Sequence, residues 1–333
     1  MPVDEGAARL RLGTRGSALA LAQSGQVARA LEAAHPGLRV ELVPMVTRGD
    51  RLAGDLTALG GKGLFTEELE RGLLDGSLDL AVHSLKDLPV TLLDELTVAA
   101  FPRRADPRDV LVSEVAAGLD GLPAAAVVLT GSLRRRAQIL LRRPDLRVEG
   151  LRGNVDTRLR RWRESGAGGL VLASAGLERL GLLAAATDLP VHPLPPEVML
   201  PAPGQGTLAL EVRRGGRAES LCRALDDPAT AAAAGAERQV VAAFGGDCTL
   251  PLAAWARWET APAAAGGAGG ASEGSGDATL RLTTLLATPD GRFAARGEAA
   301  GVAPEAVAAA CIAALRADGA EEILARVREE RRR

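Results

Sequence analysis

Arginine side chains gather in one stretch of this sequence. Between residues 134 and 163 there are eleven arginines and three acids, Asp145, Glu149 and Asp156. The guanidinium group binds carboxylates and phosphates through its paired N–H donors. Three interpretations are open at this point: a solvated helix face, a groove for nucleic acid, or a site for an acidic ligand.

Ser, Asn and Arg also recur where a predicted strand runs into a predicted helix. The residues are Ser17 with Arg15, Ser132 with Arg134 and Arg135, Asn154 with Arg152 and Arg158, and Ser174 with Arg179. Ligands of open α/β sheets bind at the carboxyl ends of strands, and helix N-termini there offer free N–H groups to anions. The repetition favours an anion-binding site over isolated N-caps. We interpret six other arginines of the stretch as solvated charges: Arg136, Arg142, Arg143, Arg160, Arg161 and Arg163.

A lysine and a carboxylate stand together in HSLKDLP, at the end of a predicted strand. Lys86 precedes Asp87, and the chain's only other lysine is Lys62 in GGKGLF. Taken alone, such a pair of residues favours the interpretation of a surface ion pair. A carboxylate among cations can also act as an acid–base group or stabilise a cationic intermediate.

The three cysteines differ in their surroundings. Cys222 and Cys311 lie in Ala- and Leu-rich helical patterns, which are typical of small core residues. Cys248 lies in FGGDCTLP, a glycine-rich loop where a thiol would be accessible, although the charge of Asp247 should raise its pKa. An odd count at unrelated spacings predicts reduced thiols in the cytoplasm, with no disulfide framework and no metal site.

Composition argues against several other classes of protein. Formal net charge is -2 and aromatic residues make up 2%, whereas binders of single-stranded nucleic acid need aromatic platforms. GGKG lacks the spacing of a phosphate loop. No apolar run approaches the ~20 residues of a membrane span, and MPVDEGAARLRLGTRG is not typical of a signal peptide. We therefore expect no nucleic acid and no membrane as partners.

Strands and helices alternate through the first two thirds of the chain, which predicts parallel sheets with crossover helices. The predicted strands are 9–13, 39–47, 78–82, 126–129, 146–150, 169–173 and 207–213, with helices over 18–34, 65–76 and after each Ser or Asn named above. Residues 47–63 are predicted to form a long loop of the kind that serves as a lid, and the proline-rich 189–206 a crossing linker. After residue 223, helices and antiparallel strands with a turn at 289–291 predict a small α+β domain, in which 261–276 is a flexible insert.

Taken together, these segments resemble the porphobilinogen deaminase (hydroxymethylbilane synthase) family. The matching segments follow one another between residue 10 and about residue 252: TRGSALALAQ, ELVPMVTRGD, GGKGLFTEELE, DLAVHSLKDLP, DPRDVLVS, GSLRRRAQ, RRPDL, LRGNVDTRL, AGLERLG, PAPGQG and DCTLP. Such a collinear set is highly specific.

The resemblance implies a fold of two α/β domains similar to type II periplasmic binding proteins, plus a small C-terminal α+β domain. Domain 1 would be discontinuous, comprising 1–103 with 204–222. Domain 2 would be 104–203, with an arginine-rich wall, and domain 3 would be 223–333 with the cofactor cysteine. The family's members join four porphobilinogen molecules head to tail into hydroxymethylbilane and release ammonia, which implies a cytoplasmic, monomeric enzyme of tetrapyrrole (haem and chlorophyll) biosynthesis.

The resemblance also implies roles for single residues. Asp87 would be the catalytic carboxylate, and Cys248 would carry one dipyrromethane cofactor per chain through a thioether. The cofactor would be bound by Lys86, Asp87, Thr130, Ser132, Arg134, Arg135 and Arg158, and the substrate by Arg15, Ser17, Arg152 and Arg179. Lys62 and Phe65 would belong to the lid. No metal is implied.

The sequence departs from the family pattern at Ala58, Gly131, Pro203 and Asp247. Gly131 removes one hydroxyl contact, and Asp247 places a carboxylate beside the attachment cysteine. The alternative from the residues alone is a small-molecule carboxylate-binding protein on the same two-domain scaffold. It would account for the arginines but not for Asp87 or Cys248.

Overall fold

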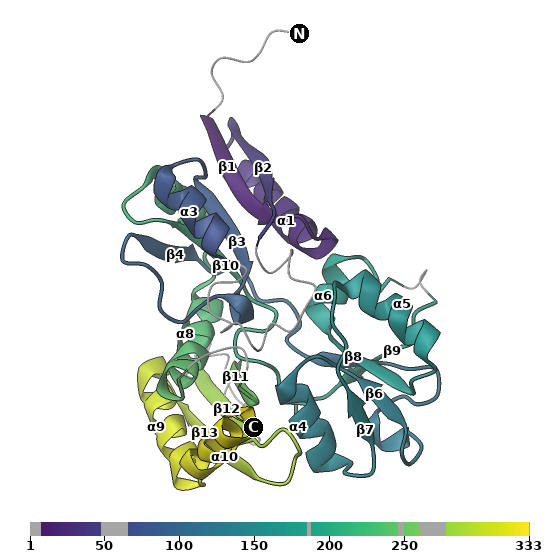
Figure 1. Cartoon of the computed structure of the whole chain (residues 1–333). Coiled ribbons are helices and arrows are strands. Elements are labelled where there is room, and N and C mark those ends of the chain that lie inside the picture. Colours follow the sequence, from purple (N-terminus) through teal and green to yellow (C-terminus); the bar gives the residue numbers. More distant parts are fainter. Residues whose placement is uncertain (1–7, 48–65, 185–187, 246–249, 260–277, 333) are drawn as a thin grey trace, which may run out of the picture.

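The computed structural model describes residues 8–47, 66–184, 188–245, 250–259 and 278–332. Within them the strands form three separate sheets, two of five strands and one of three. Figure 1 shows the sheets as three bodies, each with its own helices. The segments that join the first two bodies run through the middle of the molecule.

The first sheet has the strand order β2-β1-β3-β10-β4. Its strands are β1 (Ala8–Arg15), β2 (Leu38–Met45), β3 (Leu80–Ser84), β4 (Leu96–Ala100) and β10 (Leu208–Arg213). One face packs Leu12 and Leu80 against α1 (Ala18–Ala34) and α7 (Arg217–Cys222). The opposite face packs Ala81 against Leu69 and Leu73 of α3 (Glu67–Asp75). The strand after PAPGQG thus completes the first sheet, as expected.

The second sheet repeats this design with the order β7-β6-β8-β5-β9. Its strands are β5 (Asp109–Val112), β6 (Val127–Leu129), β7 (Arg147–Glu149), β8 (Gly169–Ala173) and β9 (Val191–Leu194). One face is covered by α5 (Val155–Ser165) and α6 (Ser174–Arg179), and the other by α4 (Leu133–Arg142). Strands β4, β5 and β9 were not expected from the sequence, and β9 lies inside the predicted linker 189–206.

The expectation of parallel sheets is wrong for both bodies, because each sheet is mixed. β10 is antiparallel to β3 and β4, and β5 is antiparallel to β8 and β9. The pairings explain why: Leu208, which begins β10, faces Ser84 at the end of β3, and Asp109, which begins β5, faces Ala173 at the end of β8. Each of these strands enters its sheet from the edge that faces the other body, and so it runs against its neighbours.

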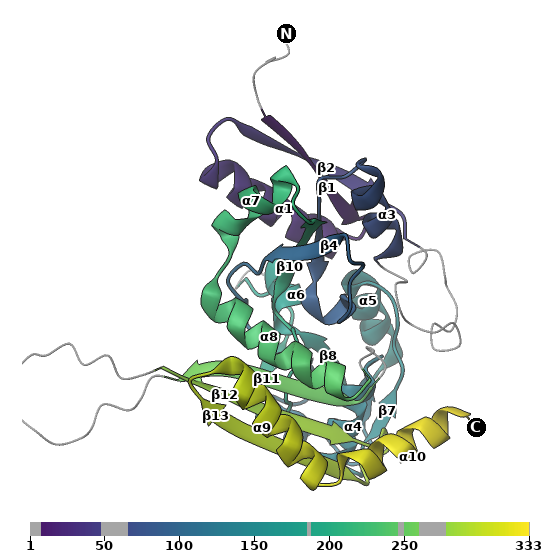
Figure 2. The same cartoon turned by 90° about the vertical axis from the view of Figure 1, so that its left-hand side faces the viewer.

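The third sheet is antiparallel, with β11 (Leu252–Glu259), β12 (Thr279–Ala287) and β13 (Ala294–Gly301) in order. Figure 2 shows α8 (Pro228–Ala243) and α9 (Pro304–Ala317) on one face of it, and their apolar residues share a core with α10 (Ala320–Arg332). The turn between β12 and β13 packs on α4, since a Cβ on Gly291 would lie 2.4 Å from the Leu141 nitrogen.

The architecture is therefore two α/β bodies plus a small C-terminal α+β body, which is the fold class expected from the sequence. Cys222 and Cys311 are fully buried in the cores, also as expected. In the described part of the chain, no helix is long and apolar enough to cross a membrane. The residue boundaries of the three domains stay a prediction.

Candidate anion-binding site at the carboxyl ends of the strands

In the first body, the predicted site residues follow two parallel strands that end at the same edge. Arg15 ends β1, and Ser17 caps α1 by accepting a hydrogen bond from the Ala20 nitrogen at 3.3 Å. After β3 the chain makes a single 3₁₀ turn, Leu85–Asp87, which carries Lys86 and Asp87. Leu85 is buried, Lys86 is half-buried and Asp87 is exposed, so the carboxylate is accessible from solvent.

In the second body, the turns after β6 and β7 lie against each other. Ser132 caps α4 by accepting from the Arg135 nitrogen at 3.4 Å, and the Ser132 nitrogen donates to Thr130 Oγ1 at 3.3 Å. A Cβ on Gly131 would lie 2.8 Å from the Leu151 carbonyl oxygen. Glycine at this position therefore permits the two turns to touch, which brings Arg152 and α5 next to the start of α4.

Arg134 and Arg135 both bind a buried carboxylate that the sequence interpretation missed. Asp109 Oδ2 accepts from Arg134 at 2.8 Å, and Asp109 Oδ1 accepts from Arg135 Nε at 3.1 Å and its terminal nitrogen at 2.8 Å. Arg134 also donates to the Leu200 carbonyl at 2.6 Å, and Arg135 to that of Val171 at 3.0 Å. These bonds fix both guanidinium groups, and the two arginines hold the pKa of Asp109 far below its usual range despite burial.

Lys86, Asp87 and Arg158 complete what we call the charge cluster: Lys86, Asp87, Asp109, Arg134, Arg135 and Arg158. Burial lowers the pKa of Lys86 to about 8; Asp87 and Asp109 oppose this, and Arg135 and Arg134 add to it. Burial also lowers the pKa of Arg158, as does Arg135, while Asp87 opposes the shift. Asp87 therefore lies in the field of Lys86 from its own body and of Arg158 from the other.

The cluster holds more positive than negative charge. Its four cations, Lys86, Arg134, Arg135 and Arg158, face two carboxylates. The buried Nε atoms of Arg134 and Arg158 have no hydrogen-bond partner among the described residues. Buried donors without acceptors are costly, and an anion with several carboxylates would satisfy them. The arrangement can thus bind a polyanion next to an exposed carboxylate.

The other predicted site residues stand as follows. Arg179 donates to the Gly206 carbonyl at 2.8 Å. Arg15 is half-buried, and Arg152 is exposed. Asn154 is the N-cap residue of α5, but its side chain makes no capping hydrogen bond. Ser174 is not an N-cap; it is the first residue of α6, and its hydroxyl donates to Asp106 at 3.2 Å. Lys62, Phe65 and Cys248 lie outside the described residues.

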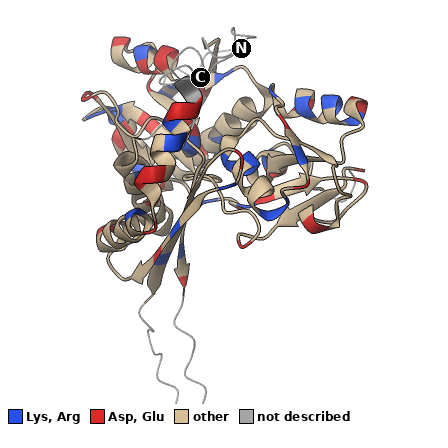
Figure 3. Cartoon of the chain, turned by 60° about the horizontal axis from the view of Figure 1, so that its bottom comes forward, with Lys and Arg blue, Asp and Glu red and all other residues tan. Residues whose placement is uncertain are grey.

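One arginine interpreted as a solvated charge has a structural role. Arg143 binds Asp145 and donates to the carbonyls of Leu119, Asp120 and Leu122 at 2.8–3.1 Å. It thereby fixes the 3₁₀ turn at 119–121. Figure 3 shows Lys and Arg next to Asp and Glu on several helices, among them the helix that ends at the C-terminus.

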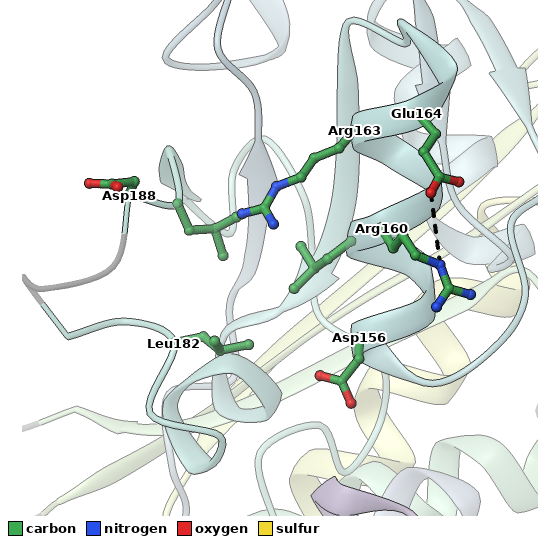
Figure 4. A pocket seen from close by; sticks show the side chains of 8 residues that line it. Asp156, Arg160, Arg163, Glu164, Leu182 and Asp188 are labelled. Carbon is green, nitrogen blue, oxygen red and sulfur yellow. Dashed lines mark ion pairs between the residues drawn. The ribbon is translucent and has the colours of Figure 1, made fainter.

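A separate open hollow of about 550 Å³ lies beside α5. Figure 4 shows Asp156, Arg160, Arg163 and Glu164 around it, with Leu182 and Asp188 opposite. Arg160 and Glu164 approach to 4.0 Å. None of its lining residues belongs to the charge cluster, and its charges are of mixed sign, so it is not the site described above.

Comparison with known proteins places the chain in a family. Residues 10–220, more than half of the chain, match the family model described as "Porphobilinogen deaminase, dipyromethane cofactor binding domain". The porphobilinogen deaminase of Rubrobacter xylanophilus is 46% identical over 97% of this chain and 98% of its own length. That of Acidithiobacillus ferrooxidans is 45% identical over 96% and 98%.

Among solved structures, the periplasmic VFT2 domain of Bordetella pertussis BvgS matches 67% of this chain and 87% of its own at 16% identity, with a TM-score of 0.39. A TM-score this low carries no weight for fold or function. The family model matches residues 10–220 and the two relatives match nearly the whole sequence, and on that basis the chain belongs to the porphobilinogen deaminase family.

Proposed function

We propose that the chain joins four porphobilinogen molecules head to tail into hydroxymethylbilane, releases ammonia at each step, and starts from a dipyrromethane primer attached to Cys248. The observation that carries this proposal is the charge cluster, in which four cations face two carboxylates and Asp87 remains exposed. Each ring of the substrate and the primer carries an acetate and a propionate. A chain of such rings needs many fixed cations, and charge-assisted hydrogen bonds to arginine supply them.

The residues of the cluster fit dipyrromethane. Its carboxylates would offset the cluster's excess of positive charge and accept from the unpartnered Nε atoms of Arg134 and Arg158. Lys86, Asp87, Thr130, Ser132 and Arg135 are the other residues that would hold it. When bound, the primer supplies the free ring carbon to which the first substrate unit is joined.

We assign the action on the reacting ring to Asp87. Loss of ammonia breaks the bond between the aminomethyl carbon and its nitrogen and leaves positive charge that spreads onto the ring nitrogen. The Asp87 carboxylate would accept the ring N–H and stabilise that charge. Bond formation to the next ring then releases a proton, which the same carboxylate would accept. Lys86 and Arg158 both interact electrostatically with Asp87 and would hold cationic charge beside it.

The roles of the surrounding residues are part of the same proposal. Arg15, Ser17, Arg152 and Arg179 would bind the carboxylates of the incoming substrate, and Lys62 and Phe65 would belong to a lid. The enzyme would act in the cytoplasm as a monomer, without nucleic acid. Sedimentation of the purified chain tests its quaternary state.

Intact mass of the denatured protein is the direct test of the covalent primer. The wild-type chain should be heavier than its sequence by one dipyrromethane unit, and Cys248→Ser should remove the excess. A thioether survives denaturation, whereas a bound ligand does not. Cys222→Ala and Cys311→Ala are matched controls that should keep the excess, because both thiols are buried in the cores.

The same preparations separate the primer from the chemistry. Asp87→Asn should keep the excess mass and lose about 10²–10⁴-fold in the rate of ammonia release from porphobilinogen. An active wild-type chain without excess mass would remove the covalent primer from the proposal. A chain that binds porphobilinogen but releases no ammonia would favour a carboxylate-binding protein.

A further inference from the structure

Gln205 stands in PAPGQG, where the chain returns from the second body to the first. It is bracketed by glycines with left-handed backbones, Gly204 at φ 74° and Gly206 at φ 86°. A Cβ on Gly204 would lie 2.8 Å from Leu85 Cγ, and one on Gly206 would lie 2.5 Å from the Ala105 carbonyl oxygen. The turn lies in the returning linker, residues 195–207 between β9 and β10. It therefore packs against both the 3₁₀ turn of Lys86 and the outgoing linker, residues 101–108 between β4 and β5.

The side chain of Gln205 is 1% exposed. Its Nε2 donates to the Pro107 carbonyl at 2.7 Å and to Asp109 Oδ1 at 2.9 Å, and its Oε1 accepts from Lys86 Nζ at 3.4 Å. Two acceptors on one side fix the orientation of the amide, because only the NH₂ group can donate. The carbonyl oxygen must then face the lysine.

The backbone around Gln205 is held from both bodies. Its carbonyl accepts from Arg104 Nε at 2.8 Å, and its nitrogen donates to the Ala202 carbonyl at 2.9 Å. The next carbonyl, that of Gly206, accepts from Arg179 at 2.8 Å and from the Ala105 nitrogen at 3.2 Å. The amide group thus sits on a fixed main chain between Lys86 and Asp109.

We propose that Gln205 is a positioning residue that holds Lys86 of the first body at one fixed distance from the Asp109–Arg134–Arg135 group of the second. Both halves of the charge cluster would then present their cations to one ligand at a constant spacing. The role in catalysis rests on the proposed function, whereas the contact with Lys86 does not.

The polarity of an amide suits this position, since one side meets a cation and the other meets two acceptors. Methionine has a similar length but would neither accept from Lys86 nor donate to Asp109. Glutamate would still accept from Lys86, but it would place a second carboxylate beside Asp109 and the Pro107 carbonyl. The two substitutions therefore act in opposite directions on the charged form of Lys86.

The test uses the fact that Lys62 and Lys86 are the only lysines. The full chain is labelled with ¹³Cε-lysine, and Lys62→Arg assigns the two signals. The groups that act on Lys86 are Asp87, Asp109, Arg134 and Arg135. We expect Gln205→Met to move the titration of the Lys86 signal to lower pH, and Gln205→Glu to move it to higher pH. Both variants should lower kcat, by about 10-fold for the hydrogen bond lost in Gln205→Met.

Gln138→Met is the matched control. Gln138 is 6% exposed and exchanges hydrogen bonds with Leu200, at 3.0 Å to its carbonyl and 2.8 Å from its nitrogen. Its loss should lower Tm without moving the Lys86 titration. If Gln205→Met and Gln205→Glu lower Tm and leave that titration in place, Gln205 only joins the segments and the proposal is overturned. A wild-type chain that releases no ammonia would refute the proposed function, and the titration would still decide the contact.

Discussion

Arg134 and Arg158 bring the same charge to the same cluster, but their surroundings differ. Arg134 is 4% exposed and donates to Asp109 and to the Leu200 carbonyl. Arg158 is half-buried, no described group accepts from its Nε, and burial lowers its pKa. Arg134 therefore contributes to folding as well as to the site. The charge of Arg158 opposes folding until an anion binds.

Leucine substitutions should separate these two cases. Arg134→Leu breaks a buried ion pair and should lower the free energy of unfolding by about 3 kcal/mol. Arg158→Leu should leave it within about 1 kcal/mol of wild type or raise it, because a partly desolvated cation is removed. Both should reduce the primer occupancy seen by intact mass. Urea unfolding gives the comparison, and an Arg158→Leu chain as unstable as Arg134→Leu would contradict it.

At the scale of the element, local patterns predicted the helices and the strands that precede the site. Ser17 and Ser132 cap the predicted helices, and Lys86 follows the predicted strand. The direction of β10 and the existence of β5 were missed, because both depend on where the chain enters each sheet, which no local pattern records. Asp109 was missed for the same reason: it reaches Arg134 and Arg135 only because β5 is antiparallel to β8. The one sequence feature that could have indicated Asp109 was an acidic residue at the start of an apolar run.

The sequence patterns also did not predict a group of polar residues between α3 and the first sheet. His83 of β3 and Glu211 of β10 approach to 2.9 Å, and both are buried. Glu70 of α3 is close to them: desolvation raises its pKa, Thr66 opposes the shift by a hydrogen bond, and Glu211 raises it further. The ionised form of Glu70 is thus disfavoured in the folded chain.

Glu70→Gln should therefore stabilise the chain at neutral pH. When folding raises the pKa of an acid, the free energy of unfolding falls as the pH rises from the acid's unfolded pKa, about 4.3, through its folded pKa. The variant should have the higher Tm at pH 7, and the difference should vanish near pH 4. Glu67→Gln, in the first turn of the same helix, should bring no gain because acids there favour the helix. A Glu70→Gln chain less stable than wild type at pH 7 would refute this account.

At the scale of the whole molecule, Glu237 of α8 joins the third body to the two linkers that connect the first two bodies. Its carboxylate accepts from Arg104 at 2.7 and 3.2 Å, from the Gly204 nitrogen at 2.6 Å and from the Ala256 nitrogen at 2.7 Å. Arg104 lies on the outgoing linker, Gly204 on the returning one, and Ala256 in β11. One fully buried side chain therefore binds both linkers to the third body.

Glu237→Gln should weaken the whole assembly. The change leaves Arg104, whose side chain is 12% exposed, without its counter-charge and turns one acceptor into a donor, so it should cost about 3–5 kcal/mol. Because Glu237 joins the third body to both linkers, calorimetry should show the single transition splitting as that body unfolds first. Glu164→Gln is the control, because Glu164 is exposed and its contact with Arg160 is long, at 4.0 Å. This substitution should change the free energy of unfolding by no more than about 0.5 kcal/mol. A Glu237→Gln chain that unfolds like this control would refute the role of Glu237 in joining the third body to the two linkers.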